Sequence, residues 1–332
     1  MANRLKIRKL DCLPILHTHK DKVLVSRRID EEDKWIYNFE IRDTKSFKVL
    51  FKDTIITDIY LTLFYNERYV IFCGYGSDKY VVDLDELRTE KIVSKHPFYS
   101  LFIDHFIGMD LDTKDYILMN SDLQVVRRKA LSSVFRIKSA LVQNLEISDE
   151  ESEISIIDPL SFKILWRRDY KGTVLIKNST NTLLFILVRE PGKDTFQIIE
   201  THSGIVKYET RKSVANVVID EMKDLAYIGN WAGITIIGLK EFNLIRSFPY
   251  PRTSKVTGMI GISHIGIMYS GNMRENFFGL MDGKTGKKLW EYDYIPEGAD
   301  TLNITNWISL KNGRQILGCY IPKKSAVIEF EP

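Results

Sequence analysis

The sequence predicts an all-β protein built from repeated four-stranded antiparallel sheets, and three observations lead to this class. Apolar residues alternate with polar ones, or form short runs, between clusters of Gly, Asp, Asn, Ser and Lys. That pattern is typical of strands separated by turns. Segments with a helical period over a dozen residues are hard to find. A turn pattern also recurs along the chain at a nearly constant spacing.

The recurring feature is an apolar strand that ends just before a tight turn. Successive copies are separated by 40, 37, 38, 42, 38 and 44 residues. A period near 40 with several strands in each unit is typical of a β-propeller, in which each unit forms one blade. The strands that precede the turns end at Asp43, Asp83, Asn120, Asp158, Glu200, Gly238 and Asp282.

The turns have a local physical explanation. An Asp or Asn side chain accepts hydrogen bonds from backbone N–H groups two residues further on and so holds the turn. Gly204 and Gly286 are able to adopt the positive φ that such a hairpin often needs. Bulky residues such as Trp166 and Trp290 end the strand that follows, and we expect them to cover the surface of the neighbouring sheet.

One of these segments, Asp282–Trp290, resembles the repeat of the quinoprotein-like (PQQ-like) β-propellers, within the wider WD40-like group. Asp158–Trp166 is a weaker copy, and Glu200–Tyr208 keeps the turn without the Trp. The resemblance implies a propeller over nearly the whole chain. Quinoprotein dehydrogenases are typically exported and often carry adjacent cysteines, and neither feature occurs here. We therefore predict no quinone and no other cofactor.

The blade count follows from placing strands around the turns. Strands are expected at 13–18, 22–27 and 34–41 in the first unit. The last unit has three, ending with 326–331, and lacks its fourth. The alternating segment 3–9 would supply the missing strand and close the ring. This predicts eight blades in a single domain over residues 1–332, or seven if 13–18 is only a connector. The expected blades are 11–53, 54–94, 95–129, 130–168, 169–210, 211–248, 249–292, and 293–332 with 3–9.

Composition narrows the class of protein. The chain has 332 residues, 44% of them hydrophobic and 27% charged, which suits a soluble domain with a large core. Its net charge of +3 is too small to predict nucleic-acid binding. The longest apolar run, Leu183–Val188, is far shorter than the roughly 20 residues that span a bilayer. No signal peptide is visible, and Cys12, Cys73 and Cys319 cannot all pair. We expect a cytoplasmic protein.

Propellers commonly bind ligands on the face made by the second-to-third strand loops and the connections between blades, as the family resemblance implies. Trp231, flanked by Gly229, Asn230 and Gly233, lies in such a loop and is a candidate anchor for a partner. Alternatively, it folds over its own blade. The other residues expected on a partner-binding face are Tyr75 and Arg274 in matching loops and Arg252 and Tyr294 in connections, each also compatible with a solvated loop residue.

The spacing of the His and Asp residues does not match a known metal site. His17 and His19 are two apart on one strand, but no third ligand has a recognised spacing. Asp110, Asp112 and Asp115 lack the Gly and Glu of a calcium loop, so no metal is predicted. The charged runs are expected to be solvated: acidic Glu31–Asp33 and Asp149–Glu151 in loops of one face, basic Arg127–Lys129 and Arg167–Arg168 at the rim.

No catalytic motif emerges from the sequence. It has no Gly-x-Ser-x-Gly elbow, no His-Glu-x-x-His and no phosphate-binding loop. The favoured hypothesis is a non-catalytic propeller that acts as an interaction scaffold for a protein partner or as a subunit of an assembly. The alternative is an enzyme or small-ligand binder with its site at the mouth of the central channel. Membrane and nucleic-acid partners are not predicted.

Overall fold

The computed structural model describes residues 6–9, 15–31, 33–65, 68–74, 78–102, 105–131, 134–148, 150–251, 256–263, 266–271, 277–293, 303–310, 315–321 and 324–331. All regular elements in these ranges are strands, as the all-β prediction requires. The chain divides into two compact units. Unit 2 is Ser100–Tyr250, and unit 1 combines Met1–Tyr99 with Pro251–Pro332.

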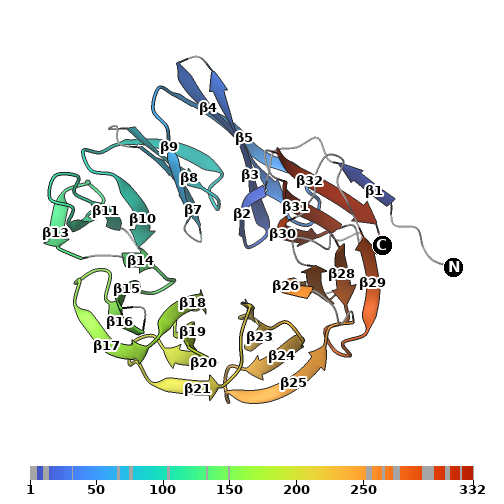
Figure 1. Ribbon diagram of the computed structural model, residues 1–332. Coiled ribbons are helices and arrows are strands. Elements are labelled where there is room, and N and C mark those ends of the chain that lie inside the picture. Colours follow the sequence, from blue (N-terminus) through green and yellow to red (C-terminus); the bar gives the residue numbers. More distant parts are fainter. Residues whose placement is uncertain are drawn as a thin grey trace. The chain divides into compact units, whose positions relative to one another are not determined.

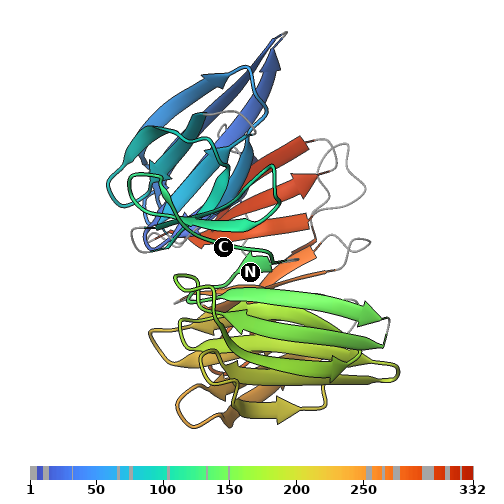
Figure 2. The ribbon, with the colours of Figure 1, turned by 90° about the vertical axis from the view of Figure 1, so that its left-hand side faces the viewer.

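Unit 2 contains four sheets, each of four consecutive antiparallel strands (Figure 1). Sheets β14–β17, β18–β21 and β22–β25, coloured green to gold, follow one another in Figures 1 and 2. The strands are β10 (Phe98–Phe102), β11 (His105–Met109), β12 (Tyr116–Met119), β13 (Val125–Lys129), β14 (Val134–Arg136), β15 (Leu141–Ser148), β16 (Glu151–Ile157), β17 (Ile164–Lys171), β18 (Thr173–Ser179), β19 (Leu183–Glu190), β20 (Lys193–Glu200), β21 (Val206–Thr210), β22 (Asn216–Asp220), β23 (Leu225–Gly229), β24 (Gly233–Gly238) and β25 (Asn243–Pro249).

Unit 1 contains four further sheets, three of them built from consecutive strands. The strands are β1 (Lys6–Lys9), β2 (Ile15–His19), β3 (Lys22–Glu31), β4 (Lys34–Asp43), β5 (Val49–Thr57), β6 (Thr62–Tyr65), β7 (Tyr69–Cys73), β8 (Asp78–Asp83), β9 (Arg88–Val93), β26 (Val256–Ser263), β27 (Gly266–Gly271), β28 (Phe277–Met281), β29 (Lys288–Asp293), β30 (Asn303–Ser309), β31 (Gln315–Ile321) and β32 (Lys324–Glu331).

The fourth sheet of unit 1 joins the two ends of the sequence. Its order is β1-β32-β31-β30, and Lys6 of β1 lies opposite Glu331 of β32. The expected N-terminal strand therefore pairs with the expected C-terminal one. The strand at 13–18 is also present as β2, which pairs with β3. The described residues thus form eight four-stranded sheets. Their number within one ring, the closure of that ring and the blade boundaries stay predictions.

Sheets stack on one another because each buries both of its faces. Strand β19 shows this clearly, since all six residues Leu183–Val188 are buried. Side chains alternate between the two faces of a strand. Leu184, Ile186 and Val188 join the core shared with sheet β14–β17, whereas Leu183, Phe185 and Leu187 join the core shared with sheet β22–β25. A sheet of this kind is stable only with a neighbour on each side.

The same packing occurs in unit 1 between sheets β2–β5 and β6–β9. Tyr37 and Phe39 from β4 meet Phe72 from β7 in one apolar cluster. The buried Tyr37 hydroxyl accepts a hydrogen bond from Leu61 N at 2.7 Å and donates one to Leu61 O at 3.2 Å. A buried hydroxyl needs such partners, and here they fix the connection that links the two sheets.

The turns before the fourth strands have the predicted Asp chemistry. Asp282 Oδ1 accepts hydrogen bonds from Thr285 N at 2.6 Å and Lys284 N at 3.0 Å. Asp43 does the same for Ser46 N and Lys45 N, at 2.6 Å and 3.1 Å. Bonds to the Thr285 hydroxyl and backbone lower the pKa of Asp282, as expected for a carboxylate that accepts several donors.

The turns also differ from the prediction in one respect. Gly204 and Gly286 have the expected positive φ, 74° and 71°. Other turns have a non-glycine residue at the equivalent position, among them the turns with Phe47 and Phe162, whose φ values are 59° and 54°. A left-handed conformation costs a non-glycine residue about 1–2 kcal/mol. Both Phe side chains are buried, at 8% and 2% exposure, and this burial offsets the strain. Glycine is therefore not the only solution to this turn.

The fourth strands β17 and β29 continue past Trp166 and Trp290 to Lys171 and Asp293, so these Trp residues do not end the strands as expected. Trp166 does cover the next sheet. Trp166 of β17 donates its indole N–H to Thr201 O at 2.7 Å and lies against Gly204, both in the β20–β21 turn. Arg168 adds a bond to Gly204 O at 2.8 Å. Trp290 packs edge-on against Phe278 of its own sheet, and its contact with the next sheet stays a prediction.

Basic residues of fourth strands link sheets in a similar way. Arg127 and Lys129 of β13 donate to Leu160 O at 3.1 Å and Phe162 O at 2.6 Å, in the turn of the next sheet. Arg128 pairs with Asp110 at 2.8 Å. The run expected to decorate the rim therefore holds the adjoining sheet and turn in place.

Replacing Gly204 with Ala is predicted to destabilise the protein by about 1–3 kcal/mol, because the new Cβ would meet the Trp166 ring at 2.9 Å in a left-handed conformation. Gly192→Ala is the matched control. Gly192 has a similar φ of 72° with open space around it, so this variant carries the backbone strain alone. Urea denaturation measures both. If Gly204→Ala and Gly192→Ala lowered the free energy of unfolding equally, the proposed Trp166 contact would be contradicted.

Asp83→Asn is predicted to cost about 1–3 kcal/mol at neutral pH. Asp83 is 4% exposed, and its carboxylate accepts two bonds from Arg68, at 2.6 Å and 2.8 Å. Burial raises the pKa of Asp83, but the bonds from Arg68, Glu86 and Asp85 outweigh it and lower the pKa overall.

The sign of the pH dependence follows from this lowered pKa. The stabilisation is complete above the unfolded pKa of about 4 and is lost as the pH falls through the folded pKa. The difference in the free energy of unfolding between wild type and Asp83→Asn should therefore shrink when denaturation is repeated in acid. A constant difference would contradict the assignment.

Candidate functional site

The loops of unit 2 that join second to third strands, together with the connections between sheets, form the face on which the sequence placed a partner site. Trp231 stands in the loop between β23 and β24, and its side chain is 63% exposed. Asn230 Oδ1 holds that loop by accepting bonds from Ala232 N and Gly233 N, both at 2.8 Å. The loop therefore presents the indole to solvent from a fixed backbone, and Trp231 does not fold over its own sheet.

A pocket of about 700 Å³ opens on the same face, between the β19–β20 turn and the connection from β21 to β22. Within this pocket, Lys193 pairs with Glu190 at 3.6 Å. Arg211 and Lys212 are exposed on the connection. The lining is polar and charged: Glu190, Gly192, Lys193, Asp194, Arg211, Lys212 and Ser213.

Backbone hydrogen bonds tie this pocket to the Trp231 loop. The connection that carries Arg211 and Lys212 runs on to Ala215, whose N–H donates to Gly229 O at 2.9 Å. Gly229 is the last residue of β23, directly before the loop. The connection that carries Arg211 and Lys212 and the strand that leads into the Trp231 loop are therefore hydrogen-bonded neighbours.

Lys177 reaches the same connection from strand β18. Its ammonium donates to Ala215 O at 3.2 Å. Burial lowers the pKa of Lys177, and the nearby positive charge of Arg189 lowers it further, while Asp194 opposes both. Lys177 and Arg189 thus place two like charges close together beside the pocket.

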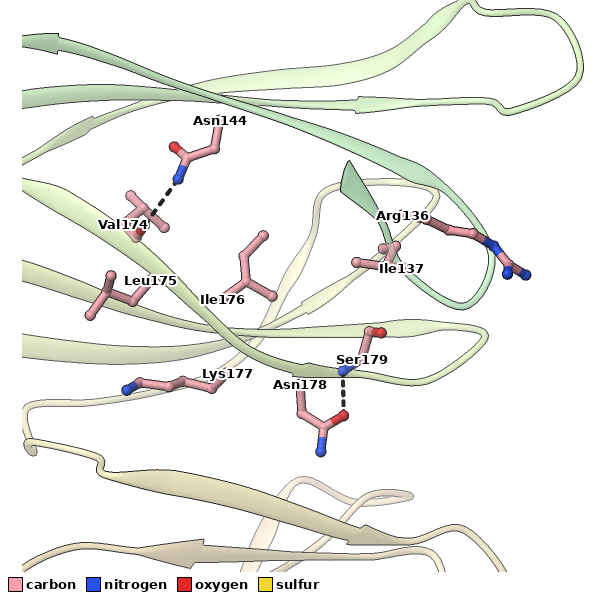
Figure 3. Close-up of a pocket in the computed structure, with 9 residues that line it drawn as sticks. All are labelled: Arg136, Ile137, Asn144, Val174, Leu175, Ile176, Lys177, Asn178 and Ser179. Atoms are coloured by element: carbon pink, nitrogen blue, oxygen red, sulfur yellow. Dashed lines mark hydrogen bonds between the residues drawn. The ribbon is translucent and has the colours of Figure 1, made fainter. Parts of the chain in front are cut away.

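A second pocket of about 440 Å³ lies along the first strands of two neighbouring sheets, β14 and β18 (Figure 3). Ile137 and Ile176 line its apolar part, whereas Arg136 and Lys177 extend in opposite directions at its ends (Figure 3). Asn144 donates to Val174 O at 3.1 Å. Its own Oδ1 is buried and accepts no hydrogen bond from the described residues.

Both pockets are lined mainly by polar and charged side chains. Their side chains offer cationic groups, amides, a few hydroxyls and, in the larger pocket, two carboxylates. Cations and amide donors suit an anion, and the buried Asn144 oxygen suits a ligand that donates a hydrogen bond.

The other four residues expected on the partner face cannot be placed. Tyr75, Arg252, Arg274 and Tyr294 lie outside the described residues. Of the five, the structure therefore tests only the exposure of Trp231. Whether Trp231 contacts a partner stays a prediction.

The histidines and aspartates considered as metal ligands have other contacts. His17 stacks on Tyr65 with ring centroids 5.3 Å apart, and His19 Nε2 lies 3.3 Å from Asp85 Oδ1. Asp110 accepts a bond from Asp112 N at 2.9 Å and pairs with Arg128, so it holds a turn. No group of three potential ligands is found among the described residues.

The acidic stretches form hairpin tips. In unit 1, Glu31 and Lys34 face each other where β3 turns into β4. In unit 2, Glu150 and Glu151 are exposed at the β15–β16 tip, and Glu150 O accepts a bond from Gly172 N at 2.5 Å. Arg167 pairs with Glu153 at 3.3 Å on the adjoining strand.

Sequence reasoning missed the cations of the larger pocket. Arg211 and Lys212 follow a strand in an ordinary charged segment, and Lys177 alternates within a strand. Their position in the sequence could have predicted them, because Arg211 and Lys212 lie in a connection between sheets on the expected face. Their proximity to Lys177 depends on the pairing of two sheets and has no sequence signature.

Comparison with known proteins supports the fold. No protein-family profile matches the chain, and no curated protein sequence does. Solved structures similar to it include BamB from Moraxella catarrhalis, with 10% identity, a TM-score of 0.52 and 98% of both chains covered. The computationally designed Ika8 protein has 10% identity and a TM-score of 0.57, with 96% of this chain and 98% of the other covered.

The dihydro-heme d1 dehydrogenase NirN is similar at 12% identity, with a TM-score of 0.53, covering 98% of this chain and 78% of its own. At such identities the likeness concerns the fold alone. The chain is accordingly an all-β protein with a fold of the β-propeller, WD40-like class. Along the described residues, no helix has the length and apolar character needed to cross a membrane.

Lys177→Met is predicted to flatten the dependence of stability on alkaline pH. Because the folded pKa of Lys177 is lowered, the unfolded state binds more protons between that pKa and about 10.4, and stability rises with pH there. The variant loses this rise. Denaturation at pH 7 and in alkali measures the effect, with the exposed Lys171→Met as control. Identical pH profiles of wild type and Lys177→Met would contradict the burial of this charge.

Proposed function

We propose that this protein is a non-catalytic interaction scaffold, cytoplasmic, in which the β-propeller holds a protein partner or forms part of an assembly. The observation that carries the proposal is Trp231. A large aromatic side chain that is 63% exposed on a backbone fixed by Asn230 resembles the anchors that dominate protein interfaces. The fixed loop lowers the entropic cost of binding.

The ring architecture suits this role. We propose that the eight sheets form one ring, closed by the pairing of β1 with β32, which would leave no free sheet edge. Such a ring offers a wide face of loops. One sector of this face contains the Trp231 loop and the larger pocket, called the cationic pocket here after Lys193, Arg211 and Lys212. Tyr75, Arg252, Arg274 and Tyr294 are proposed to extend that sector.

A small-ligand-binding propeller is the second candidate function. The pocket along β14 and β18 favours it, because the buried Asn144 Oδ1 has no donor among the described residues. An enzyme is also compatible with the fold, since the similar NirN is a dehydrogenase. The Trp231 experiment separates these functions from the scaffold.

Trp231→Ala is predicted to abolish stoichiometric capture of a protein partner from a lysate of the native organism, while changing the free energy of unfolding by less than about 0.5 kcal/mol. Quantitative mass spectrometry of the captured proteins measures the partner, and urea denaturation measures stability.

Met222→Ala is the matched control, because Met222 is 97% exposed in the β22–β23 turn, at the other end of the same sheet. This variant should retain the partner. Equal capture by wild type and Trp231→Ala would refute the anchor. Recovery of no stoichiometric partner by the wild type would favour the small-ligand function.

A further inference from the structure

The geometry of unit 2 points to the chemical class of the partner: we infer that the cationic pocket beside Trp231 binds an acidic polypeptide segment. This inference rests on the proposed scaffold function and specifies its ligand. Carboxylates of the segment would occupy the pocket lined by Arg211, Lys212 and Lys193, and an adjacent apolar residue would pack on Trp231.

Arg211 and Lys212 are available to bind a carboxylate. No carboxylate of the described residues lies within ion-pair distance of Arg211 or Lys212, and both are exposed. By contrast, many basic residues of this chain are already paired, as Lys193 is with Glu190 and Lys138 with Glu221. Arg211 and Lys212 therefore retain their full capacity for charge-assisted hydrogen bonds to a carboxylate.

Lys177 and Arg189 add further positive charge near Arg211 and Lys212. Arg189 lowers the pKa of Lys177, so the two cations repel each other, and the nearby Asp194 compensates only in part. An additional carboxylate in the pocket would relieve this repulsion. Because the Lys177 ammonium donates to Ala215 O, this positive charge lies next to the connection that carries Arg211 and Lys212.

Hydrogen bonds also link the connection that carries Arg211 and Lys212 to the strand that leads into the Trp231 loop. Ala215 accepts a hydrogen bond from Lys177 through its O atom and donates one to Gly229 O through its N–H, so the charged connection and the Trp231 loop share a backbone ladder. A short extended segment could contact both. Combining an aromatic anchor with charged neighbours is the usual composition of an interface centre and its rim.

Charge pattern favours a protein segment over a nucleic acid. Glu190 and Asp194 line the same pocket, and Glu150 and Glu151 are exposed on a neighbouring sheet of the unit. A continuous phosphate backbone would be repelled by these carboxylates. An acidic polypeptide separates its carboxylates by uncharged residues, so fewer negative charges approach these side chains.

The test measures fluorescence anisotropy of a labelled peptide rich in glutamate and leucine. Its counterpart with lysine for glutamate, and a labelled poly(U) oligonucleotide, are measured in parallel. The acidic peptide should bind wild type with a Kd below about 1 mM, and affinity should fall as NaCl rises from about 50 to about 200 mM. Arg211→Glu/Lys212→Glu should weaken binding at least about fivefold.

The matched control is Lys163→Glu/Lys287→Glu, which makes the same change in net charge at two exposed turn residues. It should bind the acidic peptide as wild type does, and circular dichroism should show all three proteins folded. Preference for poly(U), no binding of the acidic peptide, or equal weakening by both double variants would overturn the inference.

Different results would refute the acidic-segment inference and the scaffold proposal. If Trp231→Ala loses the captured partner while Arg211→Glu/Lys212→Glu retains it, the scaffold stands and the acidic-segment inference falls. If Trp231→Ala retains the partner, the scaffold anchor falls regardless of the peptide result.

Discussion

The structure depends on the burial of both faces of each sheet. Strand β19 sends Leu184, Ile186 and Val188 into one core and Leu183, Phe185 and Leu187 into the next. Burying an aliphatic side chain stabilises a fold by about 1.5–3 kcal/mol, so a sheet with two apolar faces requires two neighbours. The stacking of sheets within each unit follows from this requirement. Loops and connections then gather at the ends of the sheets, where function can be placed without disturbing the cores.

Between the sheets, the polar contacts follow a rule of their own. Residues of a fourth strand reach the backbone carbonyls of the next turn: Arg127 and Lys129 contact the turn after β16, and Trp166 and Arg168 contact the turn after β20. Carbonyl groups of a turn lack partners in the sheet, so these bonds satisfy them and fix the spacing of neighbouring sheets. A charged side chain in this fold is thus often structural, whereas Arg211 and Lys212 form no ion pair with a described residue and are exposed.

Much of the fold was predictable from local patterns. The turn spacing located the four-stranded units, and strands expected at 22–27, 34–41 and 315–321 occur as β3, β4 and β31. Local hydrogen bonding made this possible, because an Asp at the end of a strand organises its turn without distant residues. Where prediction fell short, a tertiary contact decided the outcome. Phe47 and Phe162 occupy a left-handed position that favours glycine because their burial offsets the strain.

The sequence by itself determined the strand class, the repeat and the loop position of Trp231, since periodicity and a Gly- and Asn-flanked loop are local properties. The exposure of the Trp231 side chain was decided by the tertiary structure. Only the tertiary structure decided which charges lie together. Lys177 belongs to strand β18 and Arg211 to a later connection, and the bond from Lys177 to Ala215 O brings these two segments together. Electrostatic energy depends on distance in space, which strand alternation does not encode. The loops of the proposed partner face are therefore predictable from the sequence, whereas the charge of that face is a property of the folded unit.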